Sequence, residues 1–157
     1  MSLTLSRKVD HAILTLVALA DRTDGRSFRS ATEISTSRKL SYGFTQQVLL
    51  LLKGAGFVHA DRGQFGGYTL AKTPEQISLR DIVRAVEGDM PIMMCQAKDQ
   101  GGKSLCPESG RCSAEHGFAA FRTDLSKLLE QYVLTDFMTE KERAAYAHYE
   151  QPIEVTA

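Results

Sequence analysis

All three cysteines of this 157-residue chain lie in one glycine-rich stretch, CQAKDQGGKSLCPESGRC, at residues 95–112. Thiolates are soft ligands that favour iron–sulfur clusters and zinc over calcium and magnesium. A free structural cysteine usually packs in a core, and a polar loop rich in Gly and Pro is a poor place for one. Cys95, Cys106 and Cys112 therefore predict metal binding or redox chemistry, with inert structural cysteines as the least favoured interpretation.

Besides a cluster, two other sites fit this stretch. One is a zinc site made by the three cysteines and His116, and the other is a thiol switch that oxidises Cys106 and Cys112 to a disulfide. The longest apolar run, residues 12–20, is about half of a membrane span, and no secretory signal pattern is present. We therefore expect a cytoplasmic protein without membrane contact. An odd number of cysteines there argues against a disulfide framework.

The net charge is zero, but the charges are unevenly divided along the chain. Residues 1–72 hold ten Lys and Arg against five Asp and Glu, whereas the rest of the chain holds nine against fourteen. A basic half joined to an acidic half indicates that the first half meets a polyanion such as nucleic acid. An unevenly charged, solvated surface is the alternative.

The basic half reads as a series of short helices. Apolar residues at helical spacing predict a core helix to about residue 22, carried by Val9, Ile13, Leu16, Val17 and Ala20. Ser30 and Glu33 form a capping-box pattern that predicts a helix over about 31–39. Ser41 is a second N-cap, opening a helix that ends near residues 53–55, before Gly56. Two such helices in tandem indicate a helix-turn-helix.

A glycine-tipped hairpin follows these helices. FVHA and YTLA are strand-like, and the segment between them contains Gly63, Gly66 and Gly67. A phosphate-binding loop is excluded because GQFGGY lacks both glycine-rich phosphate motifs and runs into a strand. The order of elements predicts a winged helix, in which the second helix of the pair enters the major groove of DNA.

The acidic half begins with ISLRDIVRAVEG, an amphipathic helix with Ser78 as its cap and Gly88 as its end. A further helix carries a two-heptad apolar seam, which favours dimerisation over core packing: Phe118, Phe121, Leu125, Leu128 and Tyr132. The expected fold class is mostly α, a winged helix-turn-helix domain with a small β-hairpin wing plus a long C-terminal dimerisation helix. The expected division is a DNA-binding domain at 1–90, a cysteine-rich loop at 91–112, a dimerisation helix at 113–138 and a polar tail at 139–157.

These elements predict a homodimer that reads a pseudo-palindrome in double-stranded operator DNA. Ser41, at the start of the recognition helix, is expected to contact DNA. The expected base-edge readers, in the first turns of that helix, are Tyr42, Thr45, Gln46 and Gln47. Arg62 is expected to enter from the wing, and the expected phosphate contacts are Arg38, Lys39 and Lys53.

The run RGQFGGYTLAKTPEQISLRDIVRAVEG resembles the wing and following helix of the bacterial winged-helix repressor family that includes the iron–sulfur regulator IscR, the nitric-oxide sensor NsrR and the iron regulator RirA. The pattern of Ser41, Phe44 and Gln47 is similar to that family's recognition helix, and its LxxAGxV pattern follows at residues 52–58. The resemblance covers roughly residues 3–135 and implies a DNA-binding repressor without enzyme activity. Gln46 stands where several members carry glutamate, which implies a different operator.

In sensing members of the family three cysteines hold an iron–sulfur cluster, which implies a 2Fe-2S or 4Fe-4S cluster on Cys95, Cys106 and Cys112. The spacing of the last two matches the family, whereas the gap from Cys95 to Cys106 is longer. The resemblance implies three candidates for the fourth ligand: Asp10 from the partner subunit, Glu115 and His116. Such a cluster would report redox state, nitric oxide or iron status.

Two other classes of protein remain open. One is a winged-helix regulator that senses through zinc or a bare thiol switch. The other is a small iron–sulfur electron-transfer protein. That class does not account for the wing, the charge division or the apolar seam, and the cysteine spacing of this chain is not ferredoxin-like.

Overall fold

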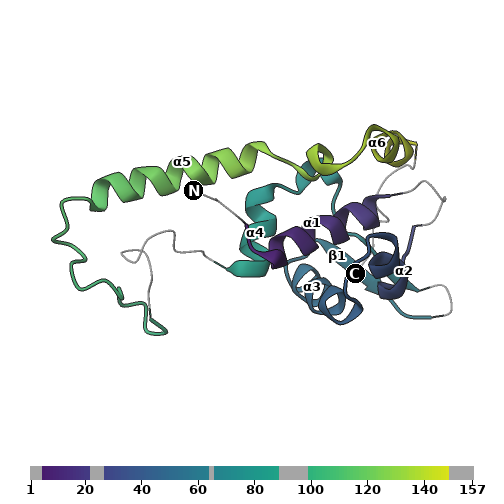
Figure 1. Ribbon diagram of the computed structural model, residues 1–157, viewed down its shortest axis with the longest axis horizontal. Helices are drawn as coiled ribbons and strands as arrows, with labels where there is room; N and C mark the ends of the chain where they lie inside the picture. Colours follow the sequence, from purple (N-terminus) through teal and green to yellow (C-terminus); the bar gives the residue numbers. More distant parts are fainter. Residues whose placement is uncertain (1–4, 22–26, 64–65, 89–98, 149–157) are drawn as a thin grey trace.

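The computed structural model describes residues 5–21, 27–63, 66–88 and 99–148 (Figure 1). Within them the fold is mostly helical, with a two-stranded antiparallel hairpin, as predicted. The elements are α1 (Arg7–Ala20), α2 (Ala31–Ser37), α3 (Tyr42–Gly54), β1 (Val58–Asp61), β2 (Gly67–Leu70), the 3-10 turn η1 (Pro74–Gln76), α4 (Leu79–Glu87), α5 (Glu115–Gln131), the 3-10 turn η3 (Leu134–Phe137) and α6 (Glu140–Ala147). No helix in the described part of the chain combines the length and apolarity that a bilayer crossing needs.

The helix starts follow the predicted capping residues. Ser30 and Glu33 form a reciprocal capping box at α2, and the hydroxyl of Ser78 accepts a hydrogen bond from the Asp81 N–H at the start of α4. Helix α2 ends two residues earlier than predicted because the chain turns at Lys39, whose φ is 54°. The Leu40 N–H donates to the Ser35 carbonyl, which closes the helix end in the manner of a Schellman motif.

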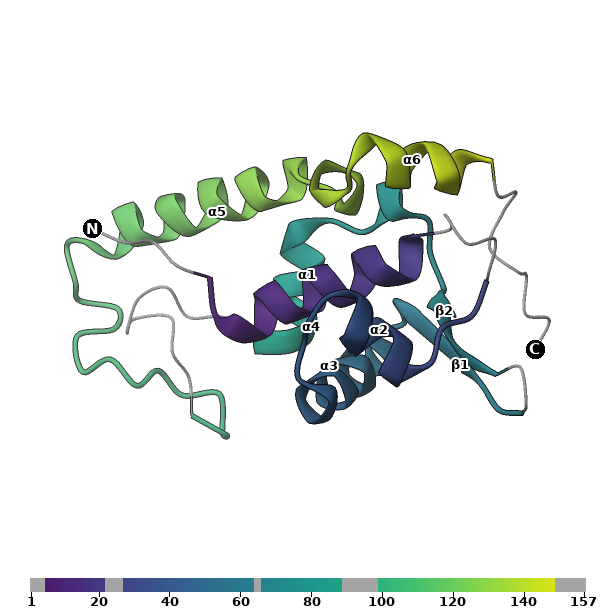
Figure 2. The same cartoon turned by 45° about the vertical axis from the view of Figure 1, so that its right-hand side comes forward.

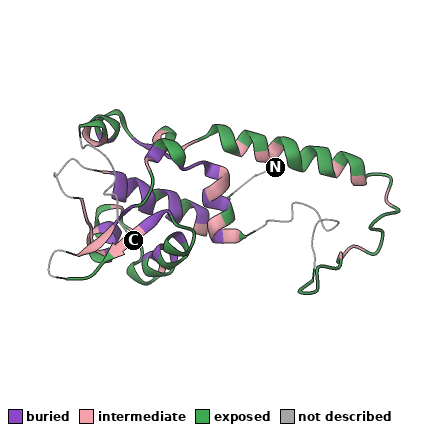
Figure 3. Cartoon of the chain, turned by 180° about the vertical axis from the view of Figure 1, so that it is seen from behind, coloured by how far each residue is buried: buried purple, intermediate pink, exposed green. Residues whose placement is uncertain are grey.

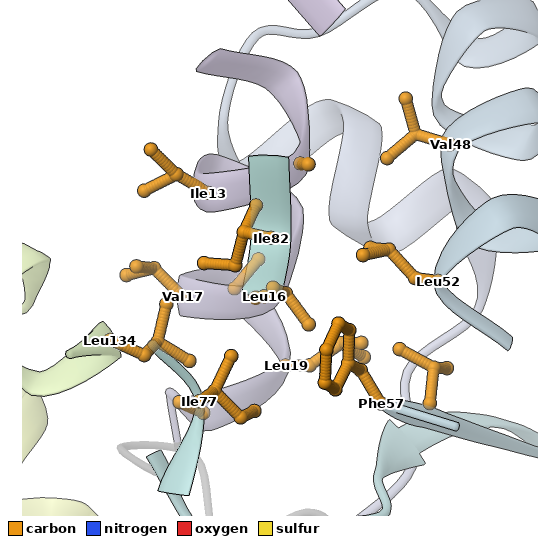
Figure 4. Close-up of a cluster of buried hydrophobic side chains, with 14 of the residues drawn as sticks. Ile13, Leu16, Val17, Leu19, Val48, Leu52, Phe57, Ile77, Ile82 and Leu134 are labelled. Atoms are coloured by element: carbon orange, nitrogen blue, oxygen red, sulfur yellow. The ribbon is translucent and has the colours of Figure 1, made fainter. Parts of the chain in front are cut away.

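Helix α1 is the centre of the core. All five of its predicted core positions are buried, which confirms the apolar periodicity. Figure 4 shows α1 between two groups of side chains, with Ile77 and Leu134 on one side and Val48 and Leu52 on the other. Each fully buried leucine of this kind contributes roughly 1.5–3 kcal/mol relative to an exposed one.

The wing is anchored to the helical core at its base. Strand β1 pairs with β2 in register from Val58–Leu70 to Asp61–Gly67. Arg29 extends this hairpin, because its N–H donates to the Tyr68 carbonyl at 2.9 Å and its carbonyl accepts from the Tyr68 N–H at 2.8 Å. Gly67 has a φ of 155°, and a Cβ there would lie 2.8 Å from the carbonyl oxygen of Arg29.

Replacing Gly67 by alanine is therefore expected to lower the free energy of unfolding by about 2 kcal/mol or more, because backbone must move to admit the Cβ. Gly54→Ala is the matched control. A Cβ at Gly54 meets nothing within 4 Å, and alanine in a helix should stabilise by up to about 1 kcal/mol. Urea denaturation of both variants measures the difference, and equal stabilities would contradict the proposed clash.

The C-terminal end of helix α5 is bonded to the core. The Leu79 N–H donates to the Tyr132 carbonyl and the Leu134 N–H to the Ile77 carbonyl, while Arg80 pairs with Glu130 at 2.5 Å. Towards its N-terminus α5 projects beyond the winged domain (Figure 1). None of its 17 residues is buried, as the exposed colouring in Figure 3 shows.

The chain after α5 returns to the winged domain. Leu134 and Met138 are buried in the core that residues up to 90 were expected to build alone. In the segment predicted as a polar tail at 139–157, residues 140–147 form α6. Thr139 and Glu142 make a capping box there, and Tyr146 packs against the core. Residues 149–157 lie outside the described part of the chain.

Candidate nucleic-acid interface and metal site

The N-terminal half of α3 presents a polar surface. Ser41, Tyr42, Gln46 and Gln47 are all exposed, and the Gln46 side-chain amide donates to the Tyr42 hydroxyl at 2.9 Å. Ser41 makes no side-chain cap hydrogen bond to the first turn of α3, although the predicted N-cap position is correct. Four of the predicted DNA-contacting residues thus lie exposed at the N-cap and in the first turns of α3.

Thr45 does not belong to this surface, and its prediction as a base reader is wrong. The side chain is fully buried, and its hydroxyl donates to the Ser41 carbonyl at 2.9 Å. A threonine one turn into a helix can satisfy its hydroxyl on the carbonyl four residues back, so it loses little by facing the core. Thr45 is therefore a packing residue between α3 and its neighbours.

Leu50 is a member of the α3 surface that sequence reasoning missed. It lies one turn beyond Gln46 and is 72% exposed, more than any other large apolar side chain described. In the sequence it is part of the run LLLL at 49–52, which reads as core. The helical phase of the buried residues Val48, Leu49 and Leu52 is the signal that directs Leu50 outwards.

Basic side chains flank the α3 surface. Lys39 is exposed in the turn before α3, and Lys53 is exposed in its last turn. Arg62 is exposed at the end of β1, where its backbone N–H donates to the Asp61 carboxylate at 2.8 Å. Figure 2 shows α3 and the β1–β2 hairpin on the same side of α1.

Arg38, predicted as a phosphate contact, is paired with acidic side chains of the protein itself. Its guanidinium lies 2.5 Å from a carboxylate oxygen of Glu142 on α6 and 3.8 Å from one of Asp21 at the end of α1. Glu142 also accepts hydrogen bonds from the backbone N–H and hydroxyl of Thr139, at 2.7 and 2.8 Å. Burial raises the pKa of Glu142, but the bonds from Arg38 and Thr139 outweigh it and leave that pKa below its ordinary value.

The first helix also touches α3 directly. The ring of His11 meets the ring of Phe44 edge-on, with centroids 4.5 Å apart. Nδ1 of His11 lies 3.2 Å from the Arg7 carbonyl oxygen, which suits an Nδ1–H donor. His11 follows Asp10, a candidate ligand that is exposed in the first turn of α1.

The described part of the cysteine loop, residues 99–112, lies at the far end of the molecule from the wing (Figures 1 and 2). Cys106 and Cys112 are free, half-buried thiols, whereas Cys95 lies outside the described residues. The Ser109 N–H donates to the Cys106 carbonyl, and the Glu115 N–H at the start of α5 donates to the Cys112 carbonyl, both at 3.2 Å. Two thiols are thus held by backbone turns directly before the projecting helix.

The candidates for a fourth ligand lie in different settings. The Glu115 carboxylate accepts from the Gly110 N–H at 3.0 Å, so it folds back over the cysteine loop, while His116 is exposed. Among the described residues no three His, Cys, Asp or Glu side chains are gathered into a metal site. The half-buried free thiols of Cys106 and Cys112 nevertheless match, in donor type, what an iron–sulfur cluster requires.

Comparison with known proteins gives a consistent result. Residues 5–140 match the model of the Rrf2 family, described as iron-dependent transcriptional regulators. The chain is 28% identical over 138 residues to the HTH-type regulator NsrR of Bacillus subtilis, covering 88% of this chain and 92% of that one. It is 37% identical over 101 residues to IscR of Cereibacter sphaeroides, covering 64% and 65%. The fold matches that of CymR, the global cysteine regulator of B. subtilis, with a TM-score of 0.64 at 24% identity over 87% of this chain and 96% of that one.

Proposed function

Because this chain belongs to the Rrf2 family of transcriptional regulators, we propose that it is a homodimeric repressor whose affinity for operator DNA depends on an iron–sulfur cluster. The observation that carries the DNA-binding part is the exposed polar face of α3, flanked by basic side chains and adjoining the wing. Regulators of this family are not enzymes, and membership of a family of transcriptional regulators also sets aside the electron-transfer alternative.

The proposed reading of DNA divides the surface by chemistry. Gln46 and Gln47 suit adenine, whose edge pairs with an amide, and Tyr42 adds a hydroxyl beside them. Ser41, Lys39 and Lys53 lie at the two ends of α3, where backbone phosphates pass a helix that enters the major groove. Arg62 is the wing's contribution to a minor groove or a phosphate.

The proposed dimer interface is the outer face of α5. Phe121, Leu128 and Tyr132 are each nearly half exposed on one face of a helix that buries none of its residues. An isolated helix of this length is marginally stable in water, so its apolar face requires a partner. A second copy fits this requirement because two half-sites of a pseudo-palindrome need two recognition helices.

The proposed cluster ligands are Cys95, Cys106 and Cys112, with Asp10 of the partner subunit, Glu115 or His116 in fourth place. Such a group supplies an iron that is open to oxidants or nitric oxide when its fourth ligand is weak. In this chain Cys106 and Cys112 would hold it directly before α5, and Glu115 would close the loop over it. Loss of these ligands would reorder residues 95–112 and shift α5, whose other end is bonded to α4 and η1. The physiological signal is then redox state, nitric oxide or iron supply.

A second candidate keeps the DNA-binding scaffold and senses through the bare thiols or through zinc. The free, half-buried state of Cys106 and Cys112 favours it, because both thiols are accessible to oxidation. Iron and acid-labile sulfide counted on anaerobically purified protein distinguish the two candidates. A brown protein that contains both supports the cluster, and a protein that stays colourless after reconstitution supports thiols or zinc.

Salt dependence tests the division between base readers and phosphate contacts. We expect Lys53→Gln to weaken binding to all duplexes and to reduce the slope of log affinity against log salt by about one. Gln46→Ala should leave that slope unchanged and relax sequence preference, with a loss of about 1–3 kcal/mol on the selected operator. Gel shifts over a salt series measure both quantities. Equal slopes for Lys53→Gln and wild type would remove Lys53 from the interface.

A further inference from the structure

Helix α6 reaches the turn of the helix-turn-helix through one ion pair. Arg38 is the C-cap of α2, and its guanidinium lies 2.5 Å from Oε1 of Glu142, which comes 104 residues later in the chain. Asp21, at the end of α1, is the third member, 3.8 Å from the same nitrogen. Three elements that are distant in sequence thus meet at the residue that separates α2 from α3.

Both carboxylate oxygens of Glu142 accept hydrogen bonds. Oε1 accepts from Arg38, and Oε2 accepts from the Thr139 N–H and hydroxyl. The residue is only 8% exposed, so its charge depends on these partners. Removing one member of such a pair leaves an uncompensated charge in a poorly hydrated place, which favours rearrangement over simple loss of a contact.

The turn that Arg38 occupies determines where α3 begins. Lys39 holds the left-handed conformation, the Leu40 N–H is bonded back to Ser35, and α3 starts at Tyr42. Only a few residues of backbone therefore separate Arg38 from the proposed DNA-reading turn at the start of α3. We propose that Glu142 on α6 holds Arg38 in place, and that both are positioning residues that set the orientation of α3 for DNA binding. This inference rests on the proposed function, because it assigns α6 a part in operator affinity.

Glu142→Gln is the informative variant, because the two possible roles of Arg38 predict opposite results. If Arg38 positions α3, releasing it should weaken operator binding by about tenfold with an unchanged salt slope. If Arg38 is a phosphate contact, releasing it from Glu142 should leave binding equal or tighter, with a steeper slope. The probe is a labelled duplex selected by the wild-type dimer from a randomised library, and affinity is measured by gel shift over a salt series.

Arg38→Met provides a second arm that does not depend on the folding of Glu142→Gln. The positioning role predicts a similar loss of operator affinity with an unchanged salt slope. The double variant Glu142→Gln/Arg38→Met should bind the operator no more weakly than the single variant with the lower affinity. Arg143→Gln, an exposed change on α6, is the matched control and should bind like wild type. Thermal melting verifies that each variant is folded at the assay temperature.

Each outcome of these measurements supports or overturns the positioning role of Arg38 and Glu142. Wild-type affinity for both Glu142→Gln and Arg38→Met, or a slope that falls by about one in Arg38→Met, would overturn the positioning role. Failure of the wild-type protein to select any duplex would overturn the proposed DNA binding and this inference with it. Weak binding by the two variants beside normal binding by wild type and Arg143→Gln would establish α6 as part of the reading unit.

Discussion

Replacing Cys106 by serine is expected to abolish the visible absorption of anaerobically purified protein and to remove nearly all of its iron and acid-labile sulfide. A serine hydroxyl is a hard ligand that stays protonated near neutral pH, so it does not replace a thiolate on iron. Cys106 is free and half-buried in a loop outside the hydrophobic core, so the variant should retain the winged domain and its melting temperature.

Ser109→Ala is the matched control for Cys106→Ser. Ser109 lies in the same loop and its backbone N–H donates to the Cys106 carbonyl, but its replacement leaves every thiol in place. It should keep full colour and iron. A coloured Cys106→Ser protein would contradict the proposed ligand set, and loss of colour in Ser109→Ala would show that loop order alone is being measured. Asp10→Ala, Glu115→Ala and His116→Ala then identify the fourth ligand by which one bleaches fastest in air.

Leu128→Glu is expected to convert the dimer to a monomer and to lower operator affinity by about a hundredfold or more. Two linked half-site contacts bind far more tightly than one, since the second becomes intramolecular. Leu128 is 47% exposed in the single chain, so a carboxylate there remains hydrated in the monomer and is desolvated only in the proposed interface. Analytical ultracentrifugation measures the association state, and gel shift measures the affinity.

Thr123→Glu adds the same charge to the opposite face of α5. Thr123 is exposed, and its hydroxyl donates only to the Ala119 carbonyl within the helix. This control should remain dimeric and bind normally. A dimeric Leu128→Glu protein would mean that the interface lies elsewhere, whereas dissociation of both variants would point to the stability of α5 itself.

The elements that local chemistry specifies were predictable from the sequence. Ser30 with Glu33 places the start of α2, and Ser78 that of α4. The glycines that tip the hairpin separate two strands that were predicted at 57–60 and 68–71 and lie one residue away from those bounds, at Val58–Asp61 and Gly67–Leu70. Each depends on hydrogen bonds or torsions within a few positions of the residue concerned. The buried positions of α1 followed from periodicity for the same reason.

The failures have a different physical origin. Arg38 was expected to contact a phosphate because it is basic, and no local pattern in the sequence indicates its ion pair with Glu142, 104 residues away. Thr45 was expected to read a base because it is polar, yet the Ser41 carbonyl satisfies its hydroxyl inside the helix. For the cysteines, residue type predicts the kind of ligand. Their spacing in a loop held by backbone turns does not predict how they would meet a fourth ligand.

The return of the chain to the winged domain has a consequence for biosynthesis. Leu134 is fully buried, Met138 nearly so, and the carbonyl of Ile77 accepts the N–H of Leu134, so the last layer of the core is translated after the cysteine loop and α5. Nascent chains fold from the N-terminus as they emerge, but here the helix-turn-helix cannot complete its packing until the ribosome has passed residue 138. A product that terminates before residue 134 therefore lacks part of the buried core of the winged domain.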